Sequence, residues 1–161
     1  MEPDLREYVL AGDNSIYADE RGRVVPVVTR AGSEPDDTGQ SAGARRVSGV
    51  SVQHTSATKL WFGQVHNLAG YRSAPHHHGE AETGGFVLSG RARIYFGAKF
   101  EDYYDFAAGD WVFVPPFMPH IECNLDRGQP LVWMTCRTPE NIVVNLPDVP
   151  DGQLRDWGTR P

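Results

Sequence analysis

The sequence predicts an all-β protein built on a single barrel domain, and three observations support this. Short segments rich in β-branched and aromatic residues recur along the chain, with turn residues between them. Glycine (17 residues) and proline (12 residues) are frequent, as a fold of short strands and many turns requires. No segment sustains the apolar spacing of an amphipathic helix.

The predicted strands follow one another closely through the middle of the chain. Residues 47–53, 60–68, 85–89, 91–96, 102–106, 111–114, 131–137 and 142–146 each have strand character. Turn residues separate them at 89–90, 107–109, 126–128 and 138–139. Strands at such short intervals are typical of an antiparallel sandwich or barrel.

The two ends of the chain differ from this middle part. Residues 24–29 (VVPVVT) predict a short strand, and the proline favours a sheet edge. Residues 30–46 are rich in Gly, Ser, Asp and Ala and predict a loop or mobile arm. The tail after Pro147 is polar apart from Leu154 and Trp157, so it is either loose or docked by the tryptophan. The expected organisation is an N-terminal arm (1–46), a barrel (47–146) and a C-terminal tail (147–161).

Size, charge and cysteine content narrow the class of protein. A chain of 161 residues, 40% of them hydrophobic, suits one domain with a real core. The net charge is −6 and no basic stripe exists, so nucleic acid and anionic membranes are poor candidate partners. There is neither a long apolar stretch nor a signal-peptide core, and Cys123 and Cys136 are expected to be buried free thiols. We therefore expect a cytoplasmic protein that acts on a small molecule.

Three histidines carry the strongest chemical signal. In a strand, His76 and His78 lie on one face and His77 on the other, so the first two imidazoles can reach one metal ion. His120 follows an apolar strand and a proline-stiffened turn that directs it back toward the barrel. Neutral imidazoles in an apolar cage suit Fe, Zn, Cu, Ni or Mn. We expect His76, His78 and His120 to bind one divalent metal ion.

The segments that carry these histidines resemble the two motifs of the cupin family. The first motif is Gly, five residues, His-x-His, three or four residues, Glu, six residues, Gly, and the stretch from Gly70 to Gly90 is similar to it. The second is Gly, five residues, Pro-x-Gly, two residues, His, three residues, Asn. The matching positions here are Gly109, Pro115, His120 and Asn124. The resemblance covers roughly residues 60–137.

The sequence departs from the cupin motifs at two places. Phe117 replaces the usual glycine of the second motif, which puts an aromatic side chain near the expected metal. The glutamate of the first motif is displaced. Counting back from Gly90 gives Thr83, which would leave three His ligands, whereas counting on from His78 gives Glu82. A regular strand favours Thr83 and a three-His site, and a bulge at Gly84-Gly85 would bring in Glu82.

The resemblance implies a single cupin jelly-roll β-barrel with extra N-terminal strands and one metal near its centre. Such N-terminal strands commonly pair across a dimer interface, which implies a homodimer. Three-His sites of this family include thiol dioxygenases and diketone-cleaving dioxygenases. Fe(II) is therefore the favoured metal, and Mn, Ni, Zn, Co and Cu stay open because these ligands accept all of them.

Other side chains are candidates for roles around the metal. Glu122 shares a strand face with His120 and is a candidate general base or orienting group, and Glu82 is a candidate proton carrier. Arg93, on a strand with Arg91, could clamp an acidic substrate. The candidate walls of the substrate pocket are Trp61, Phe117 and Met134.

Together these features predict a mononuclear Fe(II) dioxygenase acting on a small organic substrate. The alternatives are a redox-neutral isomerase, cyclase or lyase, in which the metal polarises a carbonyl, and a non-catalytic module that binds a small metabolite. Fold does not choose among them, since cupins include all of these functions.

Overall fold

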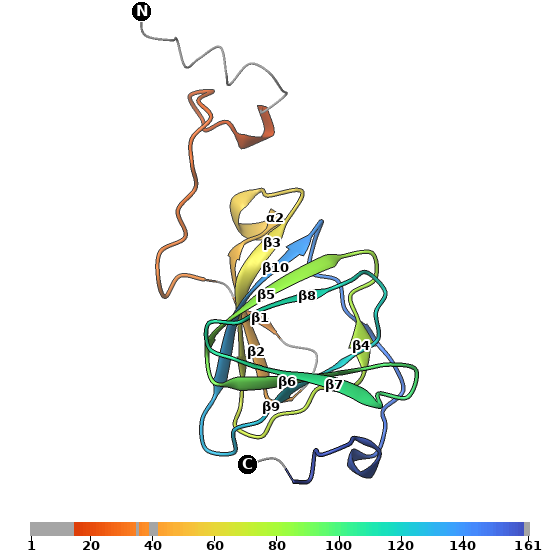
Figure 1. Cartoon of the computed structure of the whole chain (residues 1–161). Helices are drawn as coiled ribbons and strands as arrows, with labels where there is room; N and C mark the ends of the chain where they lie inside the picture. The colour runs from red at the N-terminus through yellow and green to blue at the C-terminus, as the bar shows by residue number, and fades with distance from the viewer. Residues whose placement is uncertain (1–14, 35, 39–41, 160–161) are drawn as a thin grey trace, which may run out of the picture.

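The chain forms a β-barrel in the computed structural model, which describes residues 15–34, 36–38 and 42–159 (Figure 1). The strands are β1 (Asp36–Thr38), β2 (Ala44–Val50), β3 (Trp61–Asn67), β4 (His76–His77), β5 (Glu82–Ser89), β6 (Arg91–Phe96), β7 (Asp102–Ala107), β8 (Trp111–Val114), β9 (Ile121–Asn124), β10 (Leu131–Thr138) and β11 (Val144–Asn145). The short helices are η1 (Ser15–Tyr17), α2 (Val52–Thr55) and η2 (Asp151–Gln153). No helix of the described ranges has the length and apolar character needed to cross a membrane.

Two sheets face each other and close the barrel. One has six strands in the order β1-β2-β3-β10-β5-β8, and the other has three in the order β7-β6-β9. Figure 1 shows β6, β7 and β9 across the barrel from the larger sheet, with β4 at one side between them. Every strand pair in these sheets is antiparallel, which confirms the antiparallel all-β barrel that the strand spacing predicts and agrees with the jelly roll that the cupin resemblance implies.

The inner face of β10 runs from an apolar end of the barrel interior to a polar end. Its buried residues alternate along the strand, with Leu131 and Trp133 followed by Thr135 and Arg137. The apolar end is filled by a core cluster of Val65, Val87, Ala92, Leu131 and Trp133. The polar end lies beside the histidines, so the same strand supports the core and borders the candidate metal site.

The outer face of the three-stranded sheet carries a second core, formed with the C-terminal tail. Trp157 and Leu154 are each 3% exposed and pack against the sheet. Arg72 holds the tail through ion pairs with Asp148 (3.0 Å) and Asp151 (3.1 Å). Figure 1 shows the tail running along this face. The tail is therefore docked by its tryptophan, which decides between the two alternatives that its composition left open.

The N-terminal part differs from the prediction. The strand expected at 24–29 is not formed: the structure has one isolated bridge, between Ala18 and Val24. Pro26 has no N–H to donate, and Val27 and Val28 are about 60% exposed (60% and 61%) instead of facing a neighbouring strand. Figure 1 shows this segment outside the barrel. The homodimer expected for this part of the chain stays a prediction.

The loop expected at 30–46 is also partly wrong. It contains β1 and the first residues of β2, which pairs with β3 in register Arg46↔Val65. Since Val65 is buried in the barrel, Arg46 points inward as well and is 5% exposed. Composition failed here because pairing with β3, rather than local residue preference, determines this strand. The expected strand 47–53 ends at Val50 and continues into α2.

Candidate metal centre

Backbone pairing brings the three histidines together. His76 opens β4, and its N–H donates to the carbonyl of His120 (3.0 Å), whose own N–H donates back to the His76 carbonyl (2.9 Å). On its other edge β4 pairs with β11. His78 lies on the same side as His76, as strand alternation requires. Two segments about forty residues apart in sequence are thus held in register at the position of their histidines.

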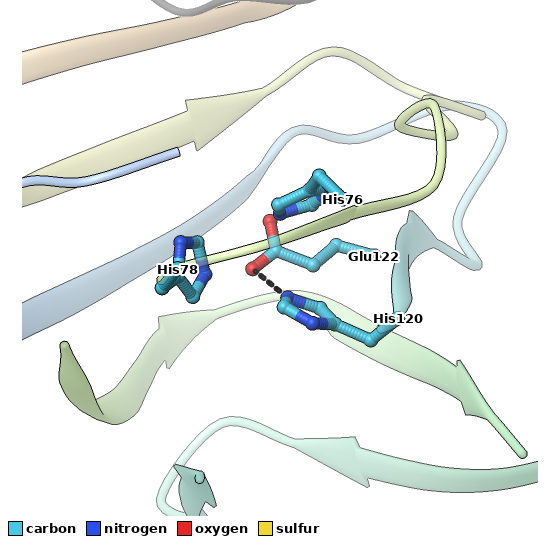
Figure 2. Close-up of side chains that lie close together, drawn as sticks. All are labelled: His76, His78, His120 and Glu122. Carbon is cyan, nitrogen blue, oxygen red and sulfur yellow. Dashed lines mark ion pairs between the residues drawn. The ribbon is translucent and has the colours of Figure 1, made fainter. Parts of the chain in front are cut away.

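Four side chains converge at this point. His76, His78, His120 and Glu122 each offer a ligand atom, and these atoms all lie within 4.8 Å of one another. The imidazole centroids are 4.3 to 5.1 Å apart. The imidazoles are at most 4% exposed and the Glu122 side chain is 12% exposed. Figure 2 shows the carboxylate lying among the three rings, with one oxygen toward His120 at 3.6 Å from Nε2.

The second nitrogen of each histidine fixes which nitrogen faces the cluster. Nδ1 of His76, His78 and His120 lies 2.9 Å from the carbonyl oxygens of Ala74, Ile142 and Met118, respectively. A carbonyl only accepts hydrogen bonds, so Nδ1 carries the proton and Nε2 presents a lone pair to the interior. This arrangement, in which a backbone group orients a ligating imidazole, is typical of metal sites.

The orphaned nitrogens fit a metal ion. Nε2 of His76 and Nε2 of His120 are buried and have no hydrogen-bond partner within the described residues. Leaving a buried acceptor unsatisfied costs about 1–3 kcal/mol, and a divalent cation bound to these lone pairs would remove that cost. Three imidazole nitrogens and one carboxylate are a donor set that Fe, Mn, Ni, Zn, Co and Cu all accept.

Protonation states agree with this interpretation. Burial, assisted by the charge of His120, lowers the pKa of His76 to about 4. Burial, assisted by the charge of Arg137, lowers the pKa of His78 to about 2. Burial alone would raise the pKa of Glu122, but the neighbouring imidazoles of His120, His76 and His78 outweigh it and hold that pKa well below its usual value. Neutral imidazoles with an ionised carboxylate are the forms that bind a metal.

The carboxylate of the cluster does not come from β5, where the first cupin motif has its glutamate. It comes from Glu122 on β9. Glu82 is exposed, whereas Thr83 is 4% exposed. β5 pairs regularly with β8 and β10 through Gly84 and Gly85, so the bulge that would turn Glu82 inward is not there. The expected register at Thr83 is therefore correct. A three-His site without a carboxylate is nevertheless wrong, because Glu122 on β9 enters the cluster from the opposite sheet.

A matched pair of variants tests this relocation of the carboxylate. Glu122→Gln is expected to weaken metal affinity by roughly 10- to 100-fold or more, since loss of even an outer partner of a ligand has that effect. Glu82→Gln is expected to leave the affinity unchanged. Competition with a chelator of known affinity measures both. Equal affinities of the two variants, or a larger loss for Glu82→Gln, would contradict the assignment.

Arg93 lies away from the cluster. It forms a two-pronged ion pair with Asp105 (2.6 and 2.8 Å), and its guanidinium stacks 3.7 Å from the Tyr103 ring centroid. Its Nη1 donates to the Tyr95 hydroxyl, which donates to the Arg155 carbonyl of the tail. The carboxylate of Asp105 raises the pKa of Arg93. The expected clamp for an acidic substrate at Arg93 is therefore wrong: this arginine joins the smaller sheet to the tail.

The three expected pocket residues occupy different places. Trp61 is 4% exposed and faces the barrel interior near Arg137. Met134 faces outward on β10, in the register that alternates with buried Trp133 and Thr135, so it does not border the cluster. Phe117 is 63% exposed, and its ring lies 6.0 Å from that of His77. Its φ of +58° explains why a glycine is usual there, because the left-handed region strains other residues.

Sequence reasoning missed Arg137 altogether. Its side chain is 1% exposed, and its Nη2 lies 3.3 Å from Nε2 of His78. The signal was available, because Trp133, Thr135 and Arg137 alternate along β10 and a buried tryptophan marks the inner face. Met134, which lies on the opposite face of β10, was predicted to line the pocket instead.

The comparisons with known proteins identify the fold. The sequence matches no family model and no curated protein. Among solved structures, an uncharacterized conserved protein with a double-stranded β-helix domain from Klebsiella pneumoniae is similar, with a TM-score of 0.55, 18% identity and coverage of 68% of this chain and 90% of that one. The chain has the double-stranded β-helix fold, which is the cupin fold.

Oxalate decarboxylases are also similar in structure. The formate complex of the Lactobacillus farciminis enzyme matches with a TM-score of 0.59 and 17% identity over 70% of this chain. A variant of the Bacillus subtilis enzyme matches with a TM-score of 0.57 and 22% identity over 68% of this chain. The match covers 33% and 30% of those two chains, so this protein corresponds to about one third of their length.

Proposed function

We propose that this protein is a mononuclear metal-dependent enzyme, with Fe(II) as the favoured metal, that oxygenates a small organic substrate. The observation that carries the proposal is the convergence of three imidazoles whose Nδ1 atoms are tied to backbone carbonyls, so that their Nε2 atoms turn to the barrel interior, where Glu122 joins them. Such pre-oriented ligands hold a metal without a further change of rotamer.

A bound Fe(II) ion would supply a centre where a substrate heteroatom and O₂ bind side by side. The chain's own contribution is electrostatic and steric. As a ligand, Glu122 would place one negative charge on the metal, which a site of three histidines lacks. It would also leave one coordination position fewer for substrate and oxygen. Burial of the cluster itself, whose imidazoles are at most 4% exposed, excludes bulk water from the reacting groups.

A redox-neutral lyase is the second candidate, and two observations favour it. Glu122 is an ionised carboxylate held within reach of His120, so it is placed to accept a proton from a metal-bound substrate. The oxalate decarboxylases that are similar in structure carry this fold, and decarboxylation breaks a carbon–carbon bond, which supports the lyase as an alternative. Isomerase and cyclase chemistry would use the same proton transfer.

Metal analysis followed by oxygen-uptake measurements tests the proposal. The protein, purified without a histidine tag, is loaded anaerobically with Fe(II), and its metal content is measured by mass spectrometry. Oxygen consumption is then followed with thiols, diketones and phenolic acids. Uptake coupled to product supports the oxygenase. Product without uptake favours the lyase, binding without turnover favours a metabolite-binding module, and failure to retain any metal contradicts the proposal.

A further inference from the structure

Arg137 places a full positive charge beside the candidate metal centre. It is the largest of the fully buried side chains, at 1% exposure. Its Nη2 lies 3.3 Å from Nε2 of His78, and its Nη1 donates to the Oδ1 atom of Asn141. The guanidinium carbon lies 5.8 Å from the centroid of the Trp61 ring. The guanidinium is thus within hydrogen-bond range of an atom that belongs to the metal cluster.

Arg137 is the middle member of a row of three buried hydrogen-bond donors. On the inner face of the large sheet it pairs in register with Trp61 of β3 on one side and with Thr83 of β5 on the other. Both neighbours are 4% exposed. Trp61 Nε1 and Thr83 Oγ1 are buried, and neither has a hydrogen-bond partner in the part of the chain that the structure describes. We call Trp61, Arg137 and Thr83 the donor row.

The donor row requires an acceptor. An indole N–H can only donate, and a threonine hydroxyl donates readily. Burying such groups without a partner is costly, and native proteins rarely leave them so. The unsatisfied donors of Trp61 and Thr83 flank the positively charged guanidinium of Arg137. Together they indicate a ligand that offers several acceptor atoms and carries negative charge.

The electrostatics of the barrel interior favour the same occupant. A divalent metal held by His76, His78, His120 and Glu122 would lie close to the Arg137 guanidinium, and two cations repel strongly where water is excluded. An anion between them would attract both. A carboxylate has two coplanar oxygens that match the two donors of a guanidinium.

We infer that the substrate of this enzyme is a small carboxylate anion, held by the donor row with its reacting end on the metal. This inference rests on the metal site of the proposed function and names its substrate class. Arg137 and Thr83 bind the carboxylate oxygens, and the Trp61 N–H donates to the same group from the other side.

A cavity of ligand size lies next to the donor row. Its volume is about 400 Å³, within the range of small-molecule sites. Its wall includes Trp61 and Asn141, which are two of the side chains in contact with Arg137. The rest of the wall comes mainly from α2 and the segment after β10. A carboxylate that enters here passes Trp61 and Asn141 before it reaches Arg137.

Calorimetric titration of the full chain tests the inference, after metal content has been measured separately. The probes are acetate and pyruvate, with uncharged acetamide as the control for shape and inorganic phosphate as the competing oxyanion. Wild type loaded with Fe(II) under anaerobic conditions is expected to bind pyruvate and acetate but not acetamide. Arg137→Met is expected to weaken carboxylate binding by roughly 10- to 100-fold, the loss typical of a hydrogen bond to a charged group.

Conservative variants keep the test decisive if Arg137→Met fails to fold. Thr83→Val removes one donor while keeping shape, and Trp61→Phe removes another while keeping an aromatic ring, and each is expected to weaken pyruvate binding several-fold with metal content unchanged. Arg91→Met, at an exposed arginine of β6, is the matched control and is expected to bind as wild type does.

The possible outcomes separate this inference from the proposed function. Carboxylate binding that depends on the donor row supports the inference, even if oxygen uptake is never seen. The inference is overturned if the metal-loaded protein binds acetamide or phosphate better than pyruvate. It is also overturned if carboxylate affinity is unchanged in Thr83→Val and Trp61→Phe. A protein that retains no metal but binds pyruvate through the donor row would overturn the proposed metal enzyme and keep the carboxylate site.

Discussion

The His120→Ala protein is expected to purify without bound metal. His120 contributes one of the three buried imidazoles of the cluster. Its loss leaves only His76, His78 and Glu122 as ligands. It also removes the contact of 3.6 Å between His120 Nε2 and the Glu122 carboxylate. Binding of a metal to the folded state alone stabilises a protein by about 2.7 kcal/mol when the free metal is at one hundred times its Kd. For a chain of this size that corresponds to roughly 5–10 °C in Tm.

The measurement is metal content by mass spectrometry together with Tm in the presence and absence of metal. Wild type should gain stability from metal, whereas His120→Ala should show one Tm in both conditions. His77→Ala is the matched control from the same histidine run. Its ring faces away from the cluster and its Nδ1 accepts the Gly79 N–H, so metal content should stay at the wild-type level. One metal ion per chain in His120→Ala would refute the ligand assignment.

Trp157→Ala is expected to destabilise the protein by about 3–5 kcal/mol, whether or not metal is present. The indole is 3% exposed and fills a core cluster with Leu154 and the outer face of the three-stranded sheet. Its removal leaves a large cavity and also releases the tail that covers this face. Urea unfolding of the metal-free and metal-loaded forms measures the loss, which should be the same in both.

Trp111→Ala provides the matched control. Trp111 is 79% exposed and packs mainly against Phe86, with ring centroids 4.4 Å apart. Its loss should cost at most about 1 kcal/mol. If Trp157→Ala were as mild as Trp111→Ala, the docking of the tail against the sheet would be wrong.

Much of the barrel was predictable because its strands are short apolar or alternating segments bounded by turn residues. The bounds of β6 and β8 agree with the pattern of apolar residues, and β3, β5, β7 and β10 agree within a few residues. The failures lie where pairing partners, not local pattern, determine structure. Residues 24–29 have strand composition but pair through a single bridge, whereas Arg45 and Arg46 look like loop residues and lie in β2 because β3 pairs with them.

The site was predictable to the extent that it depends on short-range spacing. The His-x-His of β4 and the placement of Glu122 two residues after His120 follow from alternation within one strand. Which glutamate reaches the cluster depends on how two sheets face each other, and no single-strand pattern contains that information. Alternation along β10 could have placed Arg137 on the inner face, but its neighbours Trp61 and Thr83 belong to strands far away in sequence, so the row that the three form could not be predicted.

Strand β9 has a consequence for how the two halves of the molecule influence each other. Its outward residues Ile121 and Cys123 belong to the core under the tail, while Glu122, between them, points to the histidines. These four residues therefore separate the histidine cluster on one side from the docked tail on the other. One short strand thus serves two structures at once: Ile121 and Cys123 pack under the tail, and the residue between them reaches the histidines on the other side.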